Sequence, residues 1–164
     1  MNKYILLVFI TFTCLKGYCQ NTIPVSLKHL YFGDGVIFTA QYKLPIILQE
    51  GSRAFTPSLE EIKKAEMLLL SNSNDVNYKD LSGRYTPSKL KKTLEHFNRQ
   101  YVGYQNSTSD RIILIHLLNF KNKGQARNNF DDWTNTYIIG FGDFYERNIL
   151  TLMVNLTKKE VSYF

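Results

Sequence analysis

Apolar and polar residues follow two different periods along the chain, and the change of period marks the expected elements. A period of two predicts half-buried β-strands, and apolar residues three and four positions apart predict helices with one buried face. The strand-like period covers residues 27–42 and most of the chain after residue 101, whereas the helical period covers 56–70 and 86–101. We therefore expect a first hairpin, two helices and then a run of strands.

Both expected helices begin with Thr-Pro-Ser, at Thr56 and at Thr86. A threonine N-cap followed by proline at the first helical position favours helix initiation. The residues after the two caps do not align, so we interpret the repeat as a common capping solution rather than a duplication. The expected buried faces are Leu59, Ile62, Met67, Leu68, Leu69 and Leu70 in the first helix, and Leu90, Leu94, Phe97 and Tyr101 in the second.

The expected strands form hairpins. The first hairpin turns at Gly33, Asp34 and Gly35, where glycine supplies the positive φ of a tight turn. A second hairpin joins residues 101–105 to 112–120, and the latter run is apolar on both faces, which predicts a central strand. After a polar loop, we expect the last strands at 134–145, 149–155 and 160–164.

These elements predict an α+β fold in which two helices pack on one face of an antiparallel sheet. The sheet is expected to combine the first hairpin with a meander of four to five strands. In outline this arrangement is similar to the cystatin and NTF2-like folds. Such a likeness of fold carries no function by itself.

Residues 1–19 have the pattern of a Sec-type signal peptide. Lys3 precedes a short apolar run at residues 4–12, and small residues stand at the positions that favour cleavage between Cys19 and Gln20. The apolar run is shorter than the roughly 20 residues that span a membrane. An acylated lipoprotein cysteine and an uncleaved anchor are the alternatives.

Cleavage would leave residues 20–164 as a single domain, secreted or periplasmic, with no transmembrane segment. Both cysteines, Cys14 and Cys19, would be removed. The exported chain would then contain no disulfide, no thiolate nucleophile and no cysteine metal site.

The net charge of +6 falls to +4 when Lys3 and Lys16 are removed with the signal peptide. The remaining lysines are spread over several short clusters rather than gathered on one element. Nucleic-acid binders concentrate basic residues on one face, so we expect a solvated basic surface and no nucleic-acid partner.

The stretch FNRQYVGYQN, the strand DRIILIH, Trp133 and the segment YIIGFGDFYERNILTLMVNL resemble a group of small exported bacterial proteins. Members of that group share an RQY-x-G stretch, a following strand, a tryptophan and a GG-containing hairpin near the C-terminus. Residues 99–103 match the RQY-x-G stretch, and Gly142 and Asp143 match the hairpin approximately. The resemblance implies export and an α+β fold, and it implies no reaction.

The chain contains no G-x-S-x-G, HExxH, Walker or GxGxxG motif. The leading hypothesis is therefore a non-catalytic exported domain that binds an unknown protein or small molecule through the sheet face or hairpin loops. The alternative is a small hydrolase or isomerase of NTF2-like build. In that alternative His116 would be the general base, Asp143 would orient it and Arg99 would lie in the same pocket.

Candidate ligand-binding residues are Arg99, Tyr101, His96 and His116. Arg99 either clamps a carboxylate or phosphate or is a cation at a helix C-terminus. His116 is either a base or a buried core histidine. We expect no cofactor and no metal, because the two histidines lack a third ligand at diagnostic spacing. A pocket where these groups converge would indicate an enzyme, and a filled core with His116 bonded to backbone would indicate a binding domain.

Overall fold

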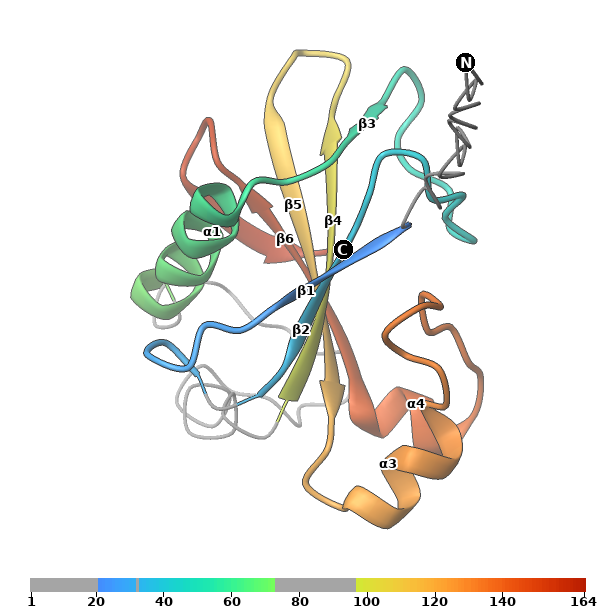
Figure 1. The fold of residues 1–164 in the computed structure, drawn as a ribbon. Coiled ribbons are helices and arrows are strands. Elements are labelled where there is room, and N and C mark those ends of the chain that lie inside the picture. Colours follow the sequence, from blue (N-terminus) through green and yellow to red (C-terminus); the bar gives the residue numbers. More distant parts are fainter. Residues whose placement is uncertain (1–20, 32, 73–96) are drawn as a thin grey trace, which may run out of the picture.

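The computed structural model describes residues 21–31, 33–72 and 97–164, which form an α+β fold around one mixed sheet (Figure 1). The strands lie in the order β1-β2-β4-β5-β6-β7, and β3 pairs with β4. Their bounds are Thr22–Val25 (β1), Gly35–Phe38 (β2), Arg53–Phe55 (β3), Phe97–Gln105 (β4), Arg111–Asn119 (β5), Ile149–Asn155 (β6) and Glu160–Tyr163 (β7).

The sheet is mixed, so the expectation of an antiparallel sheet is wrong in one place. β2 runs parallel to β4, with Gly35 opposite Arg99, and every other strand pair in the described ranges is antiparallel. β3 continues along the same edge of β4, with Phe55 opposite Gly103. The direction of a strand pair depends on the path of the connection, which local patterning does not encode.

The hairpin of β4 and β5 forms the centre of the sheet, as the apolar pattern of residues 112–120 predicts. The predictions for β6 and β7 are also confirmed. The predicted strand at 134–145 is wrong, because α4 (Asp143–Asn148) and irregular backbone occupy that region, and α3 (Lys123–Asn129) replaces the expected polar loop.

The first predicted helix is confirmed as α1 (Leu59–Asn72), but Ser58 rather than Thr56 caps it. The Glu61 N–H donates to the Ser58 hydroxyl, and the Glu61 carboxylate accepts from the Ser58 N–H at 2.9 Å, which is a capping box. The Thr56 hydroxyl instead accepts from the Ala40 N–H at 2.9 Å. The N-cap is therefore Ser58 and not Thr56, so the helix begins later in the chain than predicted.

Two further predictions are corrected. The strand pattern that begins at residue 27 predicts a first strand that contains His29. This prediction is wrong, because the first strand lies at Thr22–Val25 and residues 28–30 form a turn. Phe97 and Tyr101 belong to β4 and not to a second helix. Residues four positions apart share a face in a helix and also in a strand, so their spacing does not distinguish the two structures. The rest of the predicted second helix, residues 86–96, lies outside the described residues.

Both faces of the sheet are covered. α1 covers one face, and α3 and α4 lie on the opposite side, towards one end of β5 (Figure 1). The segment 41–48 packs alternate residues onto the second face, around Phe38 and Tyr104. Each large apolar side chain buried in this way stabilises the fold by about 1.5–3 kcal/mol. Within the described ranges no helix is long and apolar enough to cross a membrane.

The Gly33-Asp34-Gly35 segment leads into β2, but its glycines have a different role from the predicted one. In the described residues only Gly51 and Gly142 among the glycines have positive φ. A Cβ on Gly33 would lie 2.0 Å from the Phe97 carbonyl oxygen, so this glycine permits a close approach to β4. The Asp34 carbonyl accepts from the Arg99 N–H at 2.9 Å and holds the segment there.

Candidate functional site

His116 lies in the packed interior on the face of β5 that points away from α1. It is 4% exposed and its ring stacks on Tyr137, with ring centroids 4.6 Å apart. Its Nε2–H donates to the Ile138 carbonyl at 3.0 Å, so Nδ1 is the acceptor for the Thr151 hydroxyl at 2.7 Å. Burial lowers the pKa of His116 to about 4, although the bond to Ile138 opposes that shift. Both ring nitrogens are engaged within the chain, so the imidazole is held neutral and has no open position for a substrate.

Arg99 and Tyr101 lie on the other face of the sheet, under α1, in a buried polar cluster with Glu66 and Tyr31. Arg99 is 0% exposed and its Nε donates to Glu66 Oε1 at 3.0 Å. The Tyr101 hydroxyl donates to the same carboxylate oxygen at 2.8 Å. The guanidinium also stacks over the Tyr31 ring, 3.3 Å from its centroid. The carboxylate that Arg99 clamps is therefore a side chain of this protein.

The cluster shifts the acidity of both tyrosines. Burial, together with the nearby charge of Glu66, raises the pKa of Tyr31 to about 12. Burial and the same charge raise the pKa of Tyr101 well above its usual value. The two hydroxyls lie 2.6 Å apart, and both stay protonated at neutral pH. Glu66 Oε2 is buried and has no hydrogen-bond partner among the described residues.

The predicted catalytic residues do not converge. Arg99 and Gln100 are consecutive in β4 and point to opposite faces, and His116 pairs with Gln100, so His116 and Arg99 lie on opposite sides of the sheet. Asp143 is the first residue of α4, and its side chain is 86% exposed beside Arg147. The structure brings Arg99 and Tyr101 together and leaves His116 and Asp143 apart from them. His96 lies outside the described residues.

A backbone segment beside His116 is held by the buried side chains of Gln100 and His116 and by the half-buried Tyr42. The Gln100 side chain is 0% exposed, donates to the carbonyls of Trp133 and Thr136, and accepts from the Ile138 N–H at 3.0 Å. The Tyr42 hydroxyl accepts from the next N–H upstream, that of Tyr137, at 3.0 Å. Together with the bond from His116 to Ile138, these contacts fix residues 133–138 against the sheet.

The loop Ile139–Gly142 follows this fixed segment directly and leads into α4. Ile139 is 51% exposed, and Phe141 is 94% exposed. Gly140 packs against the Tyr145 ring so closely that a Cβ there would lie 2.2 Å from a ring carbon. The loop is therefore anchored on both sides while it presents two apolar side chains to solvent.

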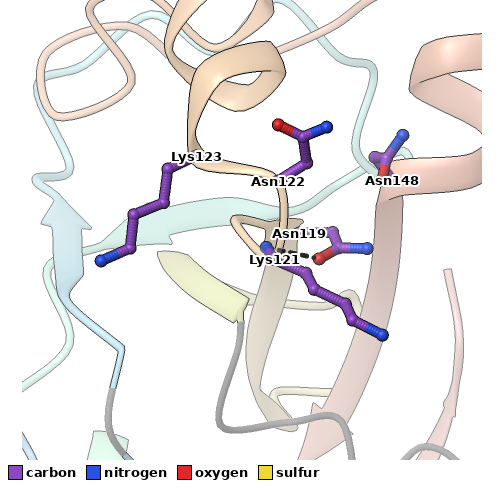
Figure 2. Close-up of a pocket in the computed structure, with 5 residues that line it drawn as sticks. All are labelled: Asn119, Lys121, Asn122, Lys123 and Asn148. Atoms are coloured by element: carbon purple, nitrogen blue, oxygen red, sulfur yellow. Dashed lines mark hydrogen bonds between the residues drawn. The ribbon is translucent and has the colours of Figure 1, made fainter.

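A surface pocket of about 660 Å³ lies where β5 leads into α3 (Figure 2). Its amides bond within the chain, because the Asn119 side chain accepts from the Lys121 N–H at 2.9 Å and Asn148 donates to the Phe144 carbonyl at 2.8 Å. Lys121 and Lys123 point in different directions. The pocket therefore has no converging pair of charges that would hold an anion.

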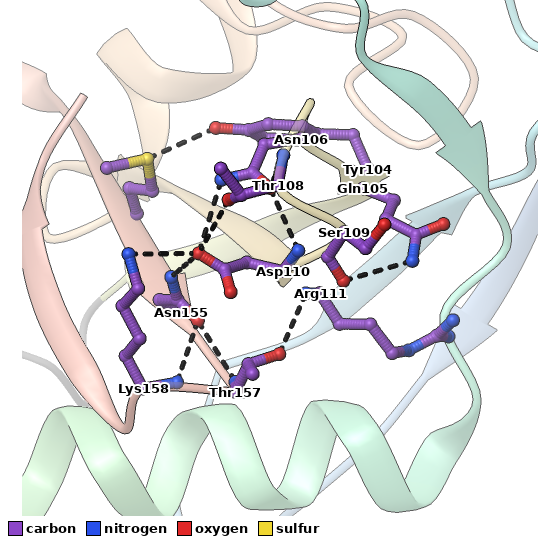
Figure 3. A network of polar contacts seen from close by, with 11 residues as sticks. Tyr104, Gln105, Asn106, Thr108, Ser109, Asp110, Arg111, Asn155, Thr157 and Lys158 are labelled. Carbon is purple, nitrogen blue, oxygen red and sulfur yellow. Dashed lines mark hydrogen bonds and ion pairs between the residues drawn. The ribbon is translucent and has the colours of Figure 1, made fainter.

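A polar network joins the β4–β5 turn to the β6–β7 turn (Figure 3). Asp110 Oδ2 accepts from Asn155 Nδ2 and from Lys158 Nζ, each at 3.1 Å, and from the Asn106 amide at 3.3 Å. The hydrogen bonds from Asn155 and Lys158 lower the pKa of the Asp110 carboxyl. Since these partners all come from the chain, the network fastens two hairpin ends together.

Sequence reasoning missed Glu66 and Gln100. Glu66 carried a usable signal, because it falls on the helix face of Ile62 and Leu69, where an acidic residue predicts a buried cationic partner. Gln100 carried none, since a glutamine in a strand is ordinary. In residues 21–31, 33–72 and 97–164, no three acidic, histidine or cysteine side chains are grouped to hold a metal. Comparison with protein families, with curated proteins and with solved structures finds no match to this chain.

Proposed function

We propose that this chain is an exported, non-catalytic binding domain that contacts a protein partner through the loop Ile139–Gly142. The observation that carries the proposal is Phe141, which is 94% exposed on a loop whose flanks are fixed. An exposed aromatic ring on a fixed loop supplies apolar contact area and loses little conformational entropy on binding. A ring that is 94% exposed suits a pocket on a protein better than a small molecule.

The interior of the fold supports a binding domain over the hydrolase or isomerase. That enzyme would need His116 and Arg99 in one pocket, and they point to opposite faces of the sheet. Both sheet faces are packed over β4 and β5, so a loop is a better contact surface than the sheet.

Export belongs to the same proposal, with residues 1–19 removed between Cys19 and Gln20. Mass measurement of the protein released by the producing cells tests this step. A mature chain that begins at Gln20 agrees with the proposal, and an acylated or uncleaved N-terminus contradicts it. The two-helix outline of the cystatin and NTF2-like folds also stays a prediction, which NMR chemical shifts of residues 86–96 would test.

A photo-crosslinking phenylalanine analogue at position 141 tests the binding loop in the producing cells. The matched control places the same analogue at Ile47, which is 95% exposed in another loop. We expect a discrete protein adduct from position 141 that is absent from position 47. Equal adducts from both positions, or none from position 141, would refute the contact.

A further inference from the structure

A second surface lies on the outer face of α1, away from the loop Ile139–Gly142. A groove of about 410 Å³ runs between α1 and the β6–β7 turn. Its apolar floor is Met67, which is 61% exposed, and the half-buried Leu68. Exposed methionine is typical of surfaces that adapt to apolar partners, because its side chain is flexible and polarizable.

The rim of this groove is basic. Lys63 and Lys64 stand on α1, Lys159 comes from the β6–β7 turn, and Glu60 is the one acidic side chain that lines the groove in the described part of the chain. Glu60 already pairs with Lys63, at 2.7 Å between Nζ and Oε1. Beside this ion pair, Lys64 places a further positive charge next to the apolar side chains of the groove.

We infer that this α1 groove binds an acidic amphipathic segment of a partner protein. Apolar side chains of the segment would contact Met67 and Leu68, and its carboxylates would lie beside Lys64. The volume accommodates a few side chains. A groove between a helix and a turn suits projecting side chains of a peptide better than the flat surface of a membrane, so we commit to a peptide. This inference is independent of the proposed loop contact.

Fluorescence anisotropy with a labelled, blocked amphipathic peptide of leucine and glutamate tests the inference on the purified protein. Each exposed charge pair contributes up to about 1 kcal/mol, so Lys64→Glu, which turns attraction into repulsion, should weaken binding about fivefold or more. Met67→Ser should weaken it by a similar factor, because it removes the apolar contact. Raising the salt concentration should weaken it further.

The matched control is Lys121→Glu, which makes the same charge change at an exposed lysine outside the groove. We expect unchanged peptide binding for this variant and for Phe141→Ala. The inference about the α1 groove can therefore fail while the proposed contact of the loop Ile139–Gly142 stands, and the reverse. Absence of binding, equal binding of a peptide with lysine in place of glutamate, or equal loss with Lys121→Glu would overturn the inference. Binding to anionic phospholipid vesicles that depends on Lys64, without peptide binding, would assign the groove to a membrane instead.

Discussion

Gln100 and His116 lie opposite each other on β4 and β5, and together they hold both backbone groups of Ile138. The Gln100 side chain accepts from the Ile138 N–H, and the His116 ring donates to the Ile138 carbonyl, each at 3.0 Å. The N–H and the carbonyl of a buried residue are thus both satisfied by two neighbouring side chains of the sheet. The exposed loop begins at the next residue, so its position depends on this pair.

Replacing Gln100 by leucine should release that segment. The change leaves the Ile138 N–H and two carbonyls without partners, which costs about 2–3 kcal/mol in the free energy of unfolding. Hydrogen exchange of the Ile138 amide should accelerate more than that of the β4–β5 amides. The matched control is Gln105→Leu on the same strand, which loses one exposed bond to Ser109 and should cost about 0.5 kcal/mol or less. Equal exchange rates at Ile138 in both variants would show that Gln100 does not hold residues 133–138 against the sheet.

His116 should make stability depend on pH between about 6.5 and 4. Its pKa is about 4 in the folded protein and 6.5 in the reference state, so in this window the unfolded chain binds a proton that the folded chain does not. The free energy of unfolding should therefore fall by about 3 kcal/mol as the pH drops through the window, and the contribution is fully present above pH 6.5.

Urea unfolding at several pH values checks this dependence. His116→Gln should flatten the curve in that window. A wild-type curve that is flat between these pH values would show that His116 does not control the acid response.

Removing one partner of the buried ion pair of Arg99 and Glu66 should strongly lower the free energy of unfolding. Glu66→Leu leaves a buried guanidinium without its carboxylate and should lower the free energy of unfolding by about 3–5 kcal/mol. The double variant Glu66→Leu, Arg99→Met should recover most of that loss, because apolar replacement of a whole buried pair is close to neutral. Chemical denaturation measures both.

The exposed pair of Lys63 and Glu60 provides the comparison for these variants. Its side chains are 33% and 80% exposed, so Lys63→Ala should change stability by less than about 1 kcal/mol. A double variant at the buried pair that is no more stable than Glu66→Leu alone would show that the loss comes from packing and not from charge.

Local patterning predicts much of this fold. The apolar run at 112–120 predicts the central strand, and α1, β6 and β7 lie where the sequence places them. The strand period at 134–145 misleads, because its apolar residues pack as irregular backbone fixed by Gln100 and not by a neighbouring strand. Satisfaction of backbone groups by a distant side chain leaves no periodic signal.

The candidate site could be predicted only in part. Arg99 and Tyr101 share a face because they are two positions apart in a strand, and that period is visible in the sequence. Their partners Glu66 and Tyr31 come from α1 and from the segment before β2. Contacts over such sequence separations depend on the topology of the sheet, including the parallel pair of β2 and β4, which the sequence pattern does not specify.

Gly140 should be the most sensitive glycine of the exposed loop. In Gly140→Ala the new Cβ would collide with the Tyr145 ring, which packs against Phe130 and Phe144 and has little room to move. Such overpacking should lower the free energy of unfolding by about 1–3 kcal/mol. The matched control is Gly124→Ala in α3, where the nearest atom lies 3.7 Å away, and helix propensity should raise stability by up to about 1 kcal/mol. Thermal unfolding of the two variants measures the difference, and a Gly140→Ala protein as stable as the control would show that the loop yields easily and does not present Phe141 rigidly.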